Sequence, residues 1–341
     1  MAAGGRTGRP QPGRRHGVGR VGDPVGEAAA LRRRVGERCT EILGDGDDAA
    51  PVGEVYVGWF AALDARACPP RFRAGGESGW GFPGWSAPLA AAAAGRAALA
   101  VHLTGGEPLG APPSLPDPLA AVRAWMKMVR TAPEGGAGRW VAERMDERDD
   151  ATIAAVAAGA TRWLAGFVRV LGWPLPPHLL VLGAGGTEGG RPLQWRPPRP
   201  SPVTVASGAD ARVGKVVGSG DFAVVIHRPT GGDDGRLHDR AAFEATAATL
   251  AIGVVPASVL VTAGDTGERV RVPVDTALLD AGADLVVAVV HQRVVATERG
   301  HDRADATPSP TCRHCDVLAE CGPGRSWLAG PGRWRGGLPV L

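Results

Sequence analysis

The chain has 341 residues, of which 44% are apolar, so it is long enough to bury the core of one large domain or two small ones. Its net charge of +3 is too small to indicate nucleic-acid binding by itself, and five cysteines are too few for a disulfide scaffold. The N-terminus lacks the apolar region of a signal peptide, and no run of about 18 apolar residues is present. We therefore expect a cytoplasmic protein that does not span or bind a membrane.

Residues 1–48 are the first of four segments that the composition distinguishes. Residues 1–38 hold nine arginines and three acidic residues. Their Gly, Pro and Arg content predicts a disordered tail up to about residue 27; the alternative is an arm that attracts phosphates. A short helix is predicted at 27–43, where Cys39 is expected to pack as a small apolar side chain.

Residues 49–200 form a helical second segment. A short helix at 59–66 precedes Cys68. Apolar periodicity predicts further helices at 89–103, 118–130, 138–145 and 152–171. The stretch 174–202 is rich in Pro and Gly and is expected to be a connector.

Residues 201–325 have a different pattern, and residues 326–341 are expected to be a tail. Valine-rich stretches at 202–217 and 221–226 predict two strands, followed by a turn at 230–235 and a helix at 238–252. Two more strands are predicted at 256–262 and 268–273, and a long helix at 276–298. The order β-β-α-β-β-α, with a helical region before it, indicates a mixed α/β fold.

Four cysteines have the spacing of a metal site. Three of them form the pattern Cys312-x2-Cys315-x5-Cys321, and Cys68 lies far upstream. Thiolates of this kind suit zinc or an iron–sulfur cluster. A site with one ligand before the α/β region and three after it would join the two ends of that region and reduce the chain entropy of the unfolded state.

This arrangement resembles the PD-(D/E)XK nuclease superfamily, in its RecB-like branch with an iron–sulfur cluster, as in AddB-type proteins. The motif Cys68-Pro69-Pro70-Arg71-Phe72 is similar to the C-P-x-R-F/Y context of the first cysteine of that branch, and the later three cysteines are similar to its C-terminal group. The resemblance covers roughly residues 55–325, judged from the order of elements. It implies a restriction-endonuclease-like mixed sheet, a helical region inserted before it, a Cys-rich C-terminal segment and a 4Fe-4S cluster on Cys68, Cys312, Cys315 and Cys321. A zinc site completed by His301 or His314 is the alternative.

The nuclease motif of the family is altered in this chain. The resemblance implies that Asp210 stands for the first metal-binding acid and that the next strand reads V-V-D-x-K-T-G. The chain instead has Val-Val-Ile-His-Arg-Pro-Thr-Gly at 224–231, with His227 at the acid position and Pro229 at the lysine position. Histidine is a poor ligand for Mg²⁺, which prefers hard oxygens, and proline carries no charge. We therefore expect a catalytically degenerate domain that binds DNA or a DNA-repair helicase–nuclease subunit without cutting.

Two alternatives remain open. The first is an active Mg- or Mn-dependent DNA exonuclease with repositioned residues, in which Asp210, Glu244 and His227 bind the metal and Lys215 supplies the positive charge. The second is a scaffold protein with no DNA role, held together by a structural zinc site.

Overall fold

The computed structural model describes the parts of the chain from which the fold follows. They are residues 22–44, 52–74, 87–104, 117–131, 141–142, 145, 150–172, 175–176, 178–182, 193–198, 201–215, 221–228, 236–299, 306–308, 312 and 318–330. The α-helices in these ranges are α1 (Pro24–Leu43), α2 (Trp59–Ala67), α3 (Pro69–Ala74), α4 (Ala87–Thr104), α5 (Pro118–Arg130), α7 (Asp150–Leu171), α8 (Leu237–Ile252), α9 (Thr276–Arg299) and α10 (Gly322–Ala329), with a 3₁₀ turn, η3 (Leu318–Glu320).

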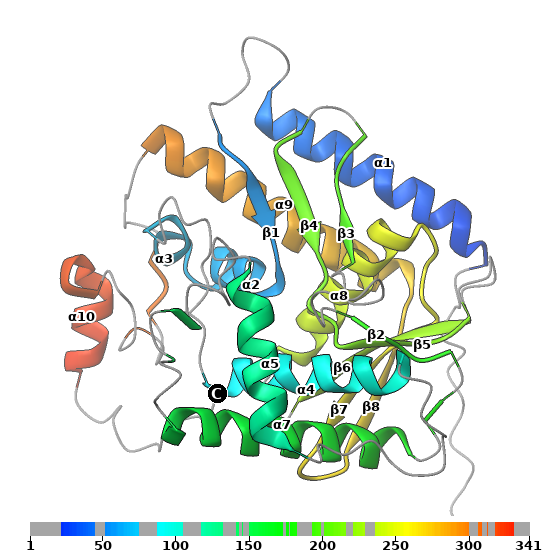
Figure 1. Ribbon diagram of the computed structural model, residues 1–341. Helices are drawn as coiled ribbons and strands as arrows, with labels where there is room; N and C mark the ends of the chain where they lie inside the picture. Colours follow the sequence, from blue (N-terminus) through cyan, green and yellow to red (C-terminus); the bar gives the residue numbers. More distant parts are fainter. Residues whose placement is uncertain are drawn as a thin grey trace, which may run out of the picture.

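The described strands form two sheets (Figure 1). The strands are β1 (Val55–Val57), β2 (Leu180–Val181), β3 (Gln194–Trp195), β4 (Val203–Ala206), β5 (Ala211–Gly214), β6 (Phe222–Arg228), β7 (Ser258–Ala263) and β8 (Arg269–Pro273). The small sheet has the order β1-β4-β3, with β1 parallel and β3 antiparallel to β4. The large sheet has the order β2-β5-β6-β7-β8. Its one parallel pair is β6 and β7, which α8 connects, and every other pair is antiparallel.

The predicted mixed α/β class is confirmed, and the helices predicted at 27–43, 89–103, 118–130, 152–171, 238–252 and 276–298 are all present. The prediction of one strand over 202–217 is wrong, because Ser207–Asp210 separates β4 of the small sheet from β5 of the large one. The predicted connector 174–202 also contains the short strands β2 and β3, which pair with β5 and β4. The predicted turn 230–235 and most of the predicted helix 138–145 lie outside the described residues.

Helix α1 is part of the main core. It begins at Pro24 because the side chain of Asp23 accepts a hydrogen bond from the Gly26 N–H at 3.0 Å, and proline is well suited to the first turn. Its buried side chains recur every three or four residues and form one apolar stripe: Ala28, Leu31, Val35, Cys39 and Leu43. The prediction that Cys39 packs in the core is thus confirmed.

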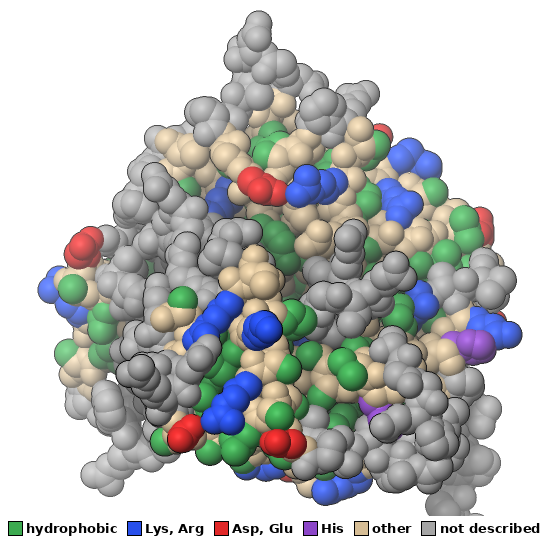
Figure 2. Space-filling model, in the orientation of Figure 1, with side chains coloured by type: hydrophobic (Ala, Val, Ile, Leu, Met, Phe, Trp, Pro, Cys, Tyr) green, Lys and Arg blue, Asp and Glu red, His purple; other side chains and the backbone are tan. Residues whose placement is uncertain are grey.

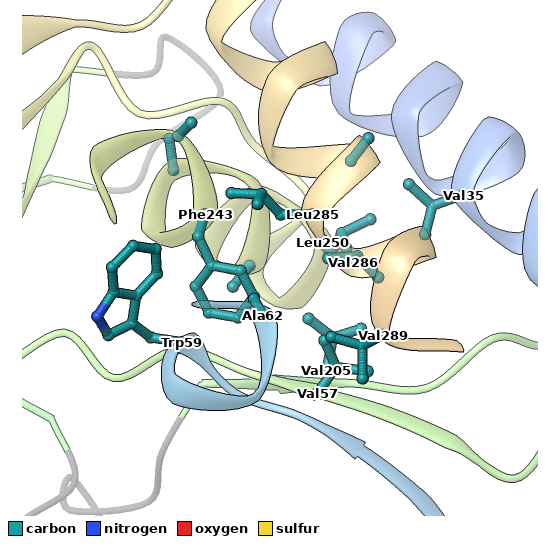
Figure 3. Close-up of a cluster of buried hydrophobic side chains, with 14 of the residues drawn as sticks. Val35, Val57, Trp59, Ala62, Val205, Phe243, Leu250, Leu285, Val286 and Val289 are labelled. Atoms are coloured by element: carbon teal, nitrogen blue, oxygen red, sulfur yellow. The ribbon is translucent and has the colours of Figure 1, made fainter. Parts of the chain in front are cut away.

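The main core lies between the two sheets and helices α1, α2, α8 and α9 (Figure 3). Phe243 of α8 lies beside Trp59 of α2, with ring centroids 6.1 Å apart. Every residue of α8 from 241 to 250 is buried, so this helix contacts protein on all sides. Arg32 of α1 donates to the carbonyl oxygens of Leu250 and Ala251, which satisfies acceptors at the C-terminal end of α8.

Helices α4 and α7 cover the other face of the large sheet (Figure 1). Successive residues of β6 alternate between the two cores, with Val225 facing α7 and Ile226 facing α8 and α9. Both faces of β6 are therefore buried, as its nearly uninterrupted apolar sequence requires. Helix α5 packs on α4 and α7 from outside and forms a further apolar cluster with them.

Candidate functional site

The link between β4 and β5 brings polar residues together at the junction of the two sheets. Ser207 N donates to the O atom of Leu193, the residue before β3 of the small sheet, and Asp210 N donates to Val225 O in the large sheet, each at 2.9 Å. Within the four residues Ser207–Asp210, the chain therefore passes from the small sheet to the large sheet. Asp210 therefore stands at the start of β5, beside the end of β6, which carries His227.

Asp210 is 3% exposed, and both of its carboxylate oxygens accept hydrogen bonds. The backbone N–H of His227 donates to Oδ2 at 2.6 Å, and Nη1 of Arg96 in α4 donates to Oδ1 at 2.5 Å. A buried carboxylate requires such partners, because an unpaired charge in the protein interior is very unfavourable. The negative charge of Asp210 is thus balanced by the protein itself.

Glu244 approaches the same link from α8 and is fully buried. Its Oε2 accepts hydrogen bonds from Ser207 Oγ at 2.6 Å and from Gly208 N at 2.9 Å, whereas Oε1 makes no hydrogen bond among the described residues. Burial raises the pKa of Glu244; the charge of Arg240 and the two hydrogen bonds oppose this rise, and the charge of Asp210 adds to it. The arrangement favours the protonated form of this carboxyl group.

His227 is held as a neutral residue of the core. Its Nδ1 lies 2.8 Å from Thr262 Oγ1, and its ring meets Trp163 and Phe167 edge-on, with centroids 5.2 and 5.4 Å away. Burial lowers its pKa, while the charge of Asp210 and a backbone interaction with Trp163 oppose this shift. The ring therefore lies in an apolar environment that disfavours its charged form.

Two glycines allow α7 to approach the sheet over this histidine. A Cβ added to Gly166 of α7 would lie 2.7 Å from Gly264 Cα and 3.3 Å from His227 Nε2. Any larger residue at Gly166 would push α7 away from the sheet. The close contact leaves little room around Nε2 for a metal ion and its other ligands.

The structure brings together three of the four residues named as catalytic candidates: Asp210, His227 and Glu244. Lys215 is exposed and follows β5, so the whole strand separates it from Asp210. The basic side chain that contacts Asp210 is that of Arg96 and not that of Lys215. Sequence analysis did not select Arg96. One available signal was the position of Arg96 in an otherwise almost uncharged, alanine-rich helix.

The donors at this site do not fit a Mg²⁺ or Mn²⁺ ion. Such ions need several free oxygen ligands. Among the carboxylate oxygens of Asp210 and Glu244, only Glu244 Oε1 lacks a hydrogen bond within the described residues, because Asp210 is already bound by Arg96 and the His227 N–H. The other buried atom of the site without a partner there, His227 Nε2, is a nitrogen. Within the described ranges, no group of three or more His, Cys, Asp or Glu side chains is placed to hold a metal.

Two of the four candidate cluster cysteines lie close together. A Cβ added to Gly324 would lie 3.2 Å from Cys321 Sγ and 3.7 Å from Cys312 Sγ, so both buried sulfurs face this glycine. Cys321 is the N-cap of α10, and its Sγ accepts a hydrogen bond from Gly324 N at 3.4 Å. Cys68 is half-buried between α2 and α3, and Cys315 lies outside the described residues. Cys312, Cys321 and the helix N-terminus behind them fit a site for thiolate ligands.

No family model, curated protein or solved structure matches the chain.

One described helix, α7, is long and apolar enough to cross a membrane by length and composition. Half of its most apolar window is buried, where it packs on the large sheet and on α4 and α5. This is the environment of a core helix, and it is compatible with a soluble protein.

The raised pKa of Glu244 predicts a pH-dependent stability. A carboxyl group whose folded pKa exceeds its unfolded pKa contributes fully to stability below the unfolded value, and this contribution is lost as the pH rises through the folded value. We expect Glu244→Gln to become progressively more stable than the native protein above pH 5, by up to about 1.4 kcal/mol per pH unit. Urea unfolding at several pH values measures this difference.

The same substitution at exposed Glu268, in the turn between β7 and β8, is the control and should leave the pH dependence unchanged. The contribution of His227 to stability depends on pH in the opposite direction to that of Glu244. It is lost as the pH falls through the lowered folded pKa of the histidine. The difference between the native protein and Glu244→Gln cancels the histidine contribution. A difference that is constant from pH 5 to pH 8 would contradict the raised pKa of Glu244.

Proposed function

We propose that this protein is a RecB-like member of the PD-(D/E)XK nuclease superfamily whose nuclease site is degenerate, and that it binds DNA or a DNA-repair helicase–nuclease subunit in the cytoplasm. The observation that carries the proposal is the position of Asp210 beside His227, with Arg96 in place of a metal ion. Asp210 and His227 are the positions at which the resemblance places two metal-binding acids. Here one is neutralised by an arginine and the other is a buried histidine.

The order of the large sheet supports the fold assignment. Strands β2, β5 and β6 are antiparallel neighbours, β6 leads through α8 to β7, which is parallel to β6, and β7 continues into a hairpin with β8. This is a mixed sheet with a helical crossover, as the resemblance to a restriction-endonuclease-like core requires. Asp210 and His227 lie on the two adjacent antiparallel strands at the same end.

The charges on α5 are compatible with a phosphate-containing partner. Lys and Arg side chains gather around α5, beside acidic ones, in the lower middle of Figure 2. Arg123 and Lys127 are exposed there, and Arg123 also pairs with Asp150 at 3.2 Å. A basic helix surface of this kind makes sequence-independent contacts with the DNA backbone.

Purified protein is expected to bind DNA without cutting it. We expect no cleavage of single- or double-stranded DNA with Mg²⁺ or Mn²⁺, and an affinity that falls steeply as salt rises, because phosphate contacts release counterions. Nuclease assays and fluorescence anisotropy at several salt concentrations measure both properties.

Two outcomes separate the proposal from its alternatives. Cleavage that Asp210→Ala abolishes would establish the active exonuclease with repositioned residues. Absence of DNA binding even at low salt, with no helicase–nuclease partner recovered, would favour the scaffold protein. Lys127→Glu tests the proposed contact surface on α5 and should weaken DNA binding without changing the folded structure, since Lys127 is exposed.

We further propose that Cys68, Cys312, Cys315 and Cys321 hold a 4Fe-4S cluster, which would act as a structural cross-link. The convergence of two sulfurs on Gly324, with an N–H donor beside one of them, supports a thiolate site. We expect anaerobically purified protein to be brown, and Cys68→Ser to lose the visible absorbance and much of the stability. Iron, sulfide and zinc analysis measures the content.

Cys39→Ser is the matched control. Cys39 belongs to α1 and packs in the hydrophobic core, so its replacement should not change the visible absorbance of the iron–sulfur cluster. A colourless protein with one zinc per chain, unaffected by Cys68→Ser, would instead identify the local site completed by His301 or His314.

A further inference from the structure

The side chain of Arg96 is directed at Asp210 by the packing of α4. Gly95, its neighbour, lies against α7 so closely that an added Cβ would be 2.7 Å from the Trp163 ring. This contact fixes the position of α4 relative to α7. The side chain of Arg96 is 20% exposed and the side chain of Asp210 is 4% exposed, so the ion pair is largely shielded from water.

We propose that Arg96 is a resident cation, which occupies the position next to Asp210 and thereby excludes divalent metal ions from the site. A guanidinium group is charged at every physiological pH and binds carboxylates with directed N–H groups. A divalent ion would have to displace it and leave a positive charge without its partner. Because that displacement is unfavourable, the site stays closed to metals.

The remaining donors indicate what removal of Arg96 would uncover. Asp210 Oδ1 would lose the one side-chain partner that it has within the described residues, and Glu244 Oε1 is already buried without a hydrogen bond there. The two carboxyl groups meet at the same link, because Glu244 accepts hydrogen bonds from Ser207 and from the backbone N–H of Gly208, two residues before Asp210. Once Glu244 has released its proton to the solvent, two such hard oxygen donors, completed by water, are the kind of ligand set that Mn²⁺ binds.

This inference deepens the proposed function by naming the residue that blocks the degenerate site. The experiment that tests the inference measures metal binding by the purified protein and uses no DNA. The proposed function can therefore fail, through lack of DNA binding, while the native site still excludes Mn²⁺ and the inference stands. The inference can fail, through Mn²⁺ binding in the native site, while DNA binding is observed.

The experiment compares Mn²⁺ binding by the native protein and by Arg96→Ala. Isothermal titration calorimetry and the Mn²⁺ electron paramagnetic resonance signal measure binding, and thermal unfolding with increasing Mn²⁺ measures stabilisation. We expect no saturable binding to the native protein, and a site for about one ion per chain in Arg96→Ala. The melting temperature of the variant alone should rise with Mn²⁺ concentration.

Two further variants make the result specific. Arg96→Ala combined with Asp210→Asn should not bind Mn²⁺, since it lacks the carboxylate from which the arginine has been removed. Arg123→Ala is the control: it removes an arginine from the exposed ion pair with Asp150 and should not create a Mn²⁺ site. If Arg96→Ala does not fold without the ion, Arg96→Gln replaces it. The glutamine side chain is larger than alanine and, unlike arginine, carries no charge.

Two results would overturn the inference. One is Asp210-dependent Mn²⁺ binding by the native protein, which would show that Arg96 does not exclude metals. The other is the failure of Mn²⁺ to bind or stabilise both Arg96→Ala and Arg96→Gln, including when they are refolded in its presence.

Discussion

Arg96→Ala is expected to lower the free energy of unfolding by about 3–5 kcal/mol, the cost of leaving one member of a buried ion pair without its partner. Asp210 is almost fully buried, and water can replace the guanidinium only in part. Urea unfolding at pH 7, in buffer free of divalent cations, measures the effect.

The exposed pair between Arg123 and Asp150 is the control for this prediction. Their side chains are 53% and 83% exposed, so Arg123→Ala should cost no more than about 1 kcal/mol. Combining Arg96→Ala with Asp210→Asn should restore part of the loss, because no buried charge then lacks a partner. A loss at Arg96 no larger than the loss at Arg123 would mean that the Asp210 carboxylate is solvated.

Gly282→Ala is expected to destabilise the protein by about 3 kcal/mol or more, at the upper end of the range for overpacked cores. Gly282 lies in α9 at its contact with α8, and an added Cβ would overlap the carbonyl oxygen of Ala242 and the hydroxyl group of Thr246. Neither atom can move freely: the carbonyl belongs to the backbone of α8, and Thr246 Oγ1 donates to Leu279 O. Thermal and urea unfolding measure the loss.

Gly36→Ala is the matched control with the opposite sign. Gly36 also lies within a helix, α1, but no atom lies within 4 Å of an added Cβ. Alanine there should stabilise the protein by about 0.5–1 kcal/mol, because it lowers the entropy of the unfolded chain and favours the helix. Equal effects at the two glycines would show that α8 and α9 can separate without cost.

The elements that sequence analysis predicted well are those with a strong local pattern. Helix α7 has an apolar residue on one side in every turn, and its predicted and observed ranges agree closely. The strands β2 and β3 have two residues each and lie in a stretch rich in Pro and Gly. Their identity as strands depends on pairing with β5 and β4, which a local pattern does not contain.

The candidate site was predicted in part for the same reason. Asp210, His227 and Glu244 could be named because each lies in or beside a recognisable element of the α/β region. Arg96 could not be assigned to the site: its isolated charge in an alanine-rich helix sets it apart, but it lies 114 residues from its partner and no motif links the two. Ser207–Asp210 reads as the middle of one valine-rich strand, and only the pairing with two different sheets shows that the chain turns there. Such contacts depend on tertiary structure.

The contacts of α1 have a consequence for the order in which the protein can be assembled during synthesis. Arg32 binds carbonyl oxygens of α8 that lie 218 and 219 residues later in the chain. Because synthesis proceeds from the N-terminus, α1 leaves the ribosome long before α8 and α9 exist. Its apolar stripe must therefore remain exposed or be shielded by a chaperone until most of the chain has been made. Docking of α1 closes a long loop and is expected to be a late folding step.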